Sequence, residues 1–124
     1  MTITLRYLDF DYSEDTEGHG NFDAMASTAP HKLHEVHAEI AQVLAWAHAN
    51  FPEGRGAAED GATWDFDLQQ TRESVTTDTL AFDEQSGKID VEEGSAQTQR
   101  CTVTFSISGT SDFCAELRAQ FALD

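Results

Sequence analysis

Apolar and polar residues alternate along the first part of this chain in a way that is typical of strands. Residues 2–12 and 22–26 alternate with a period of about two, and an acidic polar run separates them. The alternation changes phase between Tyr7 and Leu8, which predicts a bulge or bend because a strand cannot change face unaided. We therefore expect these two segments to form a hairpin.

A single apolar stripe predicts a helix over residues 30–50. Pro30 suits the first turn of such a helix, and Pro52 lies just past its end. Because one face alone is apolar, we expect this helix to cover a sheet. Residues 53–62 are rich in glycine and charge, which indicates a connecting loop. The stripe consists of Leu33, Val36, Ile40, Val43, Leu44, Ala47 and Phe51.

The second half of the chain predicts four further strands. Residues 64–68 and 101–108 alternate cleanly between apolar and polar side chains. Residues 80–82 and 89–91 flank a short polar turn, in which Gly87 can supply a positive φ. This second pair of segments therefore predicts a hairpin between two longer strands.

A second helix closes the predicted fold. Residues 109–112 resemble a helix cap, and an apolar stripe follows at Phe113, Cys114, Leu117 and Phe121. The chain is thus expected to be α+β, in the order ββαββββα. Two helices would pack on one face of a mostly antiparallel sheet of five or six strands. Its length of 124 residues suits a single domain, residues 1–124.

A weak internal sequence repeat suggests the hypothesis that the chain consists of two related halves. Leu8-Asp-Phe-Asp11 resembles Trp64-Asp-Phe-Asp67 at an offset of 56 residues. Two degenerate ββα halves, 1–52 and 62–124, would account for it, with a hairpin inserted in the second. Three shared letters also arise by chance, so the sequence leaves both interpretations open.

Charge changes this picture more than overall composition does. The chain has 23 Asp and Glu but 7 Lys and Arg, a formal net charge of −16. This balance leaves no basic footprint for nucleic acid and no polybasic segment for anionic lipid. The sequence shows no apolar run long enough to span a membrane, and we expect no secretory leader. We expect a cytoplasmic protein, either a monomer or a homodimer.

The two cysteines, Cys101 and Cys114, are too few for a disulfide framework or a zinc ribbon. We expect both to be reduced and buried. Cys114 falls in the first turn of the second predicted helix, where the helix dipole lowers the pKa of a thiol. It also lies on the apolar stripe, which favours an inert thiol over a nucleophile.

Carboxylates are the most abundant candidate functional groups. Those selected as candidate partner-binding residues are Asp9, Asp11, Glu14, Asp15, Glu17, Asp65 and Asp67. The first five are not a calcium loop, because Glu14 stands where a glycine is needed and Gly20 where a bidentate Glu is needed. If the two Asp-Phe-Asp strands are neighbours, four carboxylates share one face and repel one another. A divalent cation, Arg6 or Arg72, or a basic partner would relieve that repulsion.

Histidines give a weaker signal for a metal site. His34 and His37 are three residues apart on the first helix, so their imidazoles could share an ion. No third ligand follows at a known spacing, and we expect neither a structural metal nor a cofactor. The sequence contains no nucleophile motif, so no catalytic residue is assigned.

No motif in the sequence indicates a function. The charge favours a non-enzymatic binding or accessory module that docks a basic protein partner, because strong single-sign charge selects oppositely charged surfaces. The alternative is a divalent-metal-dependent enzyme that uses the Asp-Phe-Asp carboxylates or the pair His34 and His37. A metal assay separates these two classes of protein.

Overall fold

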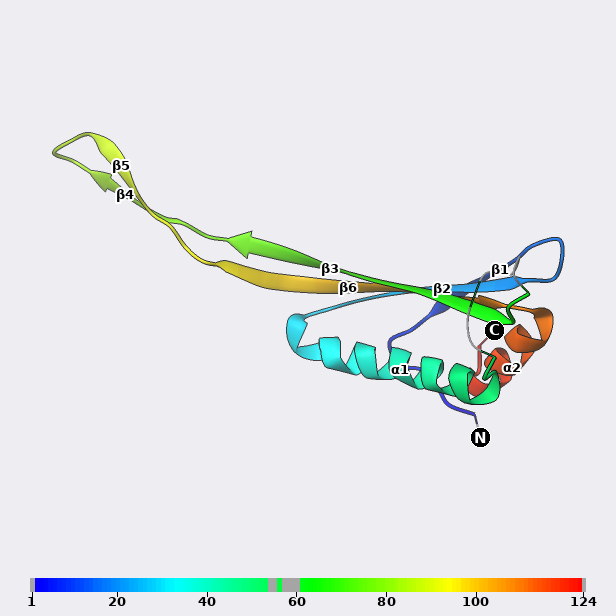
Figure 1. The fold of residues 1–124 in the computed structure, drawn as a ribbon. Coiled ribbons are helices and arrows are strands. Elements are labelled where there is room, and N and C mark those ends of the chain that lie inside the picture. Colours follow the sequence, from blue (N-terminus) through cyan, green and yellow to red (C-terminus); the bar gives the residue numbers. More distant parts are fainter. Residues whose placement is uncertain (1, 54–55, 57–60, 124) are drawn as a thin grey trace.

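The computed structural model describes residues 2–53, 56 and 61–123 (Figure 1). Most of the predicted loop over residues 53–62 lies outside the described residues. The elements are β1 (Phe10–Glu14), β2 (Gly20–Thr28), the 3₁₀ helix η1 (Pro30–Lys32), α1 (Leu33–Asn50), β3 (Trp64–Thr76), β4 (Thr79–Asp83), β5 (Lys88–Glu92), β6 (Ala96–Gly109) and α2 (Ser111–Phe121).

The predicted α+β class and the element order ββαββββα are confirmed. The strands do not form one sheet, however. Four of them form an antiparallel sheet in the order β1-β2-β6-β3, and β4 and β5 form a separate two-stranded sheet. Both helices lie on one face of the four-stranded sheet, as predicted (Figure 1). We call this sheet with its two helices the body.

The core lies between the helices and the inner face of the four-stranded sheet. Phe22 on β2 and Phe105 on β6 are fully buried there. Trp64 at the start of β3 stacks on Phe113 of α2, with ring centroids 5.7 Å apart, and its indole N–H donates to the Phe51 carbonyl. The sheet and both helices are therefore held by one continuous apolar core.

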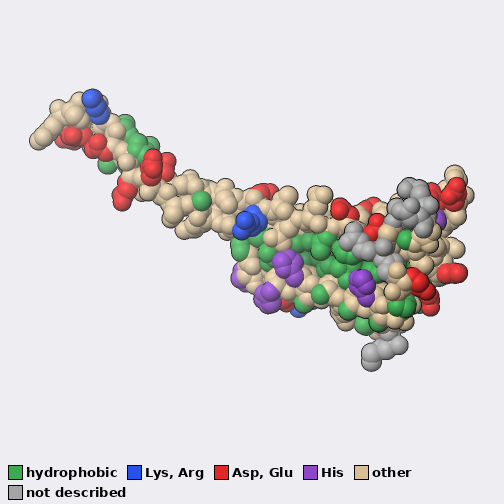
Figure 2. Space-filling model, viewed as in Figure 1, with side chains coloured by type: hydrophobic (Ala, Val, Ile, Leu, Met, Phe, Trp, Pro, Cys, Tyr) green, Lys and Arg blue, Asp and Glu red, His purple; other side chains and the backbone are tan. Residues whose placement is uncertain are grey.

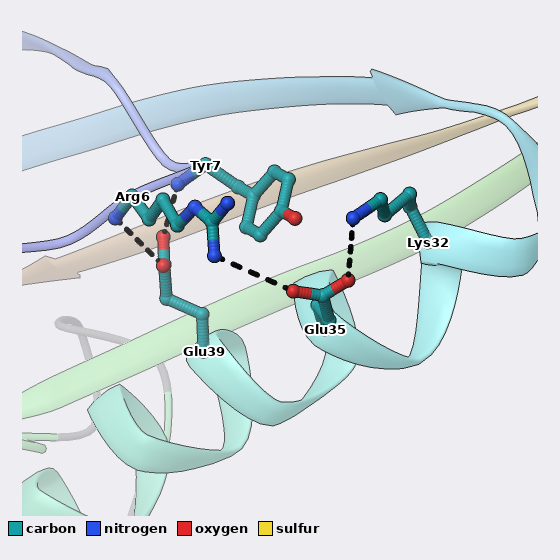
Figure 3. Close-up of polar contacts among 5 residues, drawn as sticks. All are labelled: Arg6, Tyr7, Lys32, Glu35 and Glu39. Atoms are coloured by element: carbon teal, nitrogen blue, oxygen red, sulfur yellow. Dashed lines mark hydrogen bonds and ion pairs between the residues drawn. The ribbon is translucent and has the colours of Figure 1, made fainter.

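The first predicted strand is wrong for residues 2–9, because β1 begins at Phe10. The backbone before β1 lies outside the sheet and contacts both helices: the N–H of Ile3 donates to the Gln120 carbonyl of α2 at 2.6 Å, and residues 6–8 contact α1. One carboxylate, that of Glu39, accepts the N–H groups of Arg6 and Tyr7 at 2.7 and 2.9 Å (Figure 3). It also accepts the N–H of Leu8 at 2.7 Å. The phase change in the sequence thus marks the point at which the chain turns into the sheet.

The strand order relates the two halves of the chain. In each half an outer strand is followed by an inner strand and then by a helix. Phe10 pairs with Ala24 of β2, and Phe66 pairs with Ile107 of β6. Ala24 and Ile107 directly follow Asp23 and Ser106, which pair with each other across β2 and β6. The two Asp-Phe-Asp segments therefore occupy equivalent places about a local two-fold axis. This register supports the hypothesis of two related ββα halves, which stays a prediction.

Strands β3 and β6 are much longer than the sheet to which they belong. β2 ends at Thr28, which pairs with Cys101, and beyond this point β3 and β6 continue as a two-stranded ribbon. We call residues 73–100, which include this ribbon and the β4–β5 hairpin, the arm. Figure 1 shows the arm projecting far from the body. Almost every arm residue is exposed, since neither face of the ribbon is covered.

Candidate interaction surface

The end of the arm carries a cluster of exposed apolar side chains. Leu80 pairs with Val91 and Phe82 pairs with Ile89 across the β4–β5 hairpin. Directly opposed residues of an antiparallel pair share a face, so all four side chains lie on the same side. Their exposed fractions are 63%, 57%, 62% and 56% in that order. We call these four residues the tip patch.

A well-formed turn supports the tip patch. Gly87 has φ 74°, a conformation that glycine adopts without strain, and its N–H donates to the Asp83 carbonyl at 2.8 Å. The Asp83 carboxylate accepts the N–H of Gln85 at 2.9 Å. Hydrogen bonds from Gln85 and Ser86 hold the pKa of Asp83 below its ordinary value. The turn thus fixes the register that places the four apolar residues together.

The opposite face of the same hairpin is polar except at Ala81. Thr79 pairs with Glu92, Ala81 with Asp90, and Asp83 with Lys88. The hairpin is therefore amphipathic, although no other described element covers its apolar face. Contiguous exposed apolar surface of this kind marks interaction sites, whereas single exposed apolar residues do not.

Carboxylates surround the tip patch. Residues 77–95 contain six acidic side chains and one lysine, a net charge of −5. Figure 2 shows acidic and apolar side chains lying next to each other at the end of the arm. The acidic residues are Asp78, Asp83, Glu84, Asp90, Glu92 and Glu93.

The acidic cluster predicted near the N-terminus lies at the other end of the molecule, around the β1–β2 turn. The Asp15 carboxylate accepts the N–H groups of Glu17 and His19, each at 2.9 Å, so it shapes that turn. Glu14 accepts the Tyr12 hydroxyl at 3.3 Å. Both carboxylates thus have roles within the fold, whereas the Glu17 side chain extends into solvent.

The two Asp-Phe-Asp segments do not lie side by side, because β1 and β3 are at opposite edges of the sheet. Asp11 and Asp67 do share its outer face, with β2 and β6 between them. In the same row, Asp23 accepts hydrogen bonds from Ser106 and from Asn21. The predicted group of four carboxylates is therefore spread across the sheet. Asp9 precedes β1 and is exposed, and Asp65 is the second residue of β3, where it pairs with Ser108.

The arginines named as partners for these carboxylates are placed elsewhere. Arg6 lies 3.6 Å from Glu35, which also pairs with Lys32 at 3.4 Å (Figure 3). Arg72 is opposite Cys101, on the inner face of the sheet, where the arm begins. Neither arginine neutralises the Asp-Phe-Asp carboxylates.

The histidine pair is also separated by its contacts. His37 Nε2 is 2.7 Å from the Gln70 amide oxygen, so this side chain links α1 to β3, whereas His34 is exposed. His37 also borders a shallow apolar groove of about 140 Å³ between these elements. Among the described residues, no group of three or more His, Cys, Asp and Glu side chains is placed to hold a metal ion.

Both cysteines are free and buried, as predicted. Cys114 packs against Gly20 and Gly109, and its thiol points at the Gly109 carbonyl at a distance of 3.5 Å. Burial raises the pKa of this thiol. The burial outweighs the helix dipole, which makes Cys114 a poor nucleophile.

The sequence predicts the β4–β5 hairpin, but no motif in it indicates a function. The available signal lay in the flanking residues, since 69–79 and 92–100 are polar at almost every position. Strands with two polar faces cannot lie inside a core, so a hairpin beyond them is carried away from it.

Comparisons with known proteins give no assignment. No family model, no curated protein and no solved structure matches this chain. Within the part of the chain that the structure describes, neither helix has the length and apolar character needed to cross a bilayer.

Proposed function

We propose that this protein is a non-enzymatic binding module that docks a basic protein partner through the end of its arm. The tip patch is the observation that carries this proposal. Four large apolar side chains, each more than half exposed, are held together at the point farthest from the body. Leaving them in water is unfavourable, and covering them with a partner would remove that cost.

The charge around the patch supports a basic protein over other partners. A net charge of −5 over residues 77–95 repels nucleic acid, anionic membranes and a second copy of the arm. Lysines and arginines at the rim of a partner would be attracted to the same carboxylates. The free thiols of Cys101 and Cys114 support a reducing compartment, and we propose the cytoplasm.

The body has a mechanical role in this proposal. β3 and β6 extend from the core into the arm as a ribbon with one β-bulge between Glu73 and Ser74, and the separate β4–β5 hairpin follows at its end. The ribbon holds the patch far from the acidic surface of the body. A partner can therefore approach the patch without also contacting the helices.

The test separates apolar docking from general stickiness. The tip variant, Phe82→Thr with Ile89→Thr, removes half of the patch and keeps residues that favour strands. Met25→Thr is the matched control, because Met25 is 66% exposed on the body. Proteins captured from a native lysate are identified, and their affinities are measured with purified components. We expect the tip variant to lose a basic protein that the control retains, whereas equal binding by both variants would refute the proposal.

A second pair of variants locates the charges that attract the partner. Glu92→Gln with Glu93→Gln removes two carboxylates at the tip, and Glu14→Gln with Glu17→Gln removes two at the β1–β2 turn. We expect the tip pair alone to slow association and to reduce its dependence on salt. If the turn pair has this effect instead, the partner docks on the body, at the acidic cluster near the N-terminus that the sequence predicts as the binding site.

A further inference from the structure

We infer that the tip patch takes an amphipathic α-helix whose apolar stripe is flanked by lysines or arginines. This inference rests on the proposed function, and it names the kind of surface that the partner presents. Three features of the structure support it: the width of the patch, the way the chain covers its own sheet, and the position of the charges.

The width of the patch suits one helix. It consists of two cross-strand pairs, Leu80 with Val91 and Phe82 with Ile89. Opposed residues are about 5 Å apart, and successive residues on one face of a strand are about 7 Å apart. Side chains on one stripe of a helix recur at about 5–6 Å, and a helix is about 10 Å across. A single stripe can therefore contact all four residues at once.

The body supplies an internal precedent for this packing. Its four-stranded sheet is covered on one face by two helices, α1 and α2 (Figure 1). The body thus has one helix for every two strands, and at this ratio one helix would cover the two-stranded sheet at the tip. The buried residues of α1 are Val36, Ile40, Val43 and Ala47, which form the kind of stripe that we expect in the partner.

A strand from the partner would leave the patch exposed. Added strands pair with the edge of a sheet and lie in its plane. Pairing along β4 or β5 would widen the tip sheet, and the faces of Phe82 and Ile89 would still contact water. A helix laid across the face is the element that buries them.

The carboxylates of the tip flank the patch at both ends of the hairpin. Asp78 and Glu93 lie where the hairpin joins the ribbon, and Glu84 lies at the turn, whereas Asp83 and Glu92 belong to the opposite face. A helix lying across the strands therefore has acidic groups on both sides of its apolar stripe. Lysines or arginines beside that stripe would meet them, whereas a second copy of the acidic tip would not.

Two synthetic peptides of about 18 residues test the inference, since this length permits helix formation. Both contain leucine and lysine in equal proportion. In one the leucines follow the spacing i, i+3, i+4, i+7, i+8, which gives an amphipathic helix, and in the other they alternate with lysine, which gives a strand. Binding of each labelled peptide to the full-length protein is measured by fluorescence anisotropy, with amide NMR shifts to locate it.

We expect the helical peptide to bind at the tip and the alternating peptide to bind more weakly. The tip variant should weaken binding of the helical peptide by at least about tenfold, because two buried contacts are lost. NMR of the Gly87 amide in the variant shows whether the turn is intact. Glu92→Gln with Glu93→Gln keeps the patch and should weaken binding only at low salt.

Two outcomes would overturn the inference. Tighter binding of the alternating peptide at the tip would replace the helix with a strand and leave the proposed function standing. Equal binding of the helical peptide by the wild type and the tip variant would show attraction by charge alone. The proposed function fails separately, when a captured partner binds the tip variant as well as the wild type.

Discussion

Glu39 offers the sharpest test of how the N-terminal segment is held. Its carboxylate accepts three successive backbone N–H groups, those of Arg6, Tyr7 and Leu8. Leu8 is buried in the core, so its N–H has little access to water, and the N–H of Tyr7 is partly buried. Glu39→Ala removes the acceptor from all three groups without changing the helix that carries it.

The expected loss follows from these contacts. A hydrogen bond to a charged group contributes about 1.5–3 kcal/mol, and the smaller value suits a partly exposed carboxylate. Water can replace the bond to Arg6, which is exposed, so two bonds count toward the loss. We therefore expect the free energy of unfolding to fall by about 3 kcal/mol. For a domain of this size that lowers Tm by about 10 °C.

Urea denaturation followed by tryptophan fluorescence measures this loss. Glu35→Ala is the matched control, since Glu35 lies one turn earlier on α1 and contacts side chains: it makes the ion pairs with Arg6 and Lys32 that Figure 3 shows and a side-chain hydrogen bond with Tyr7. It should change stability far less. Glu39→Gln keeps one acceptor oxygen and should fall between the two. If Glu39→Ala costs no more than Glu35→Ala, apolar packing alone holds the segment, and the reasoning is wrong.

Three further predictions concern the body and the arm. Gly109→Ala should destabilise the protein by about 2–3 kcal/mol in thermal unfolding, because the new Cβ would lie 2.5 Å from Phe113. The pKa of the Cys114 thiol is raised in the folded protein, so the thiol of the unfolded chain ionises first. The free energy of unfolding should therefore fall as the pH rises above 9.0, the ordinary pKa of a cysteine thiol. Cys114→Ala should flatten this part of the pH profile of unfolding, and an unchanged slope would argue against it. Replacing residues 74–99 by Asn-Gly should leave the Tm of the body nearly unchanged, since the arm adds nothing to the core; a large drop would contradict this.

The elements that bury one face could be predicted from the sequence. The stripe of α1 and the alternation of residues 101–108 arise because each segment meets the core along one side. The same holds for α2, whose N-cap Thr110 accepts the N–H of Phe113. For these elements the local pattern carries the tertiary information.

Features that depend on distant partners could not be predicted. The polar outer part of β3 has the same pattern as a loop, because both of its faces contact water. The contact of Glu39 with Tyr7 joins positions far apart in the chain, and the strand order that separates Asp11 from Asp67 is equally non-local. The exposure of Phe82 could not be predicted either, because a hairpin with an uncovered apolar face has the same alternation of apolar and polar residues as a half-buried one.

The seam between β2 and β6 has a consequence for folding kinetics. Its partners are distant in sequence, since Gly20 pairs with Gly109 and Thr28 with Cys101. The β1–β2 pair, by contrast, can form outward from its local turn. The β3–β6 pair can form in the same way from the turn at Gly87, after β4 has paired with β5. Closing a long loop is slow, so we expect the seam to form last and to set the folding rate. Early pairing of β3 with β6 in the arm shortens the loop that must close between β2 and β6. The arm therefore helps the body to fold.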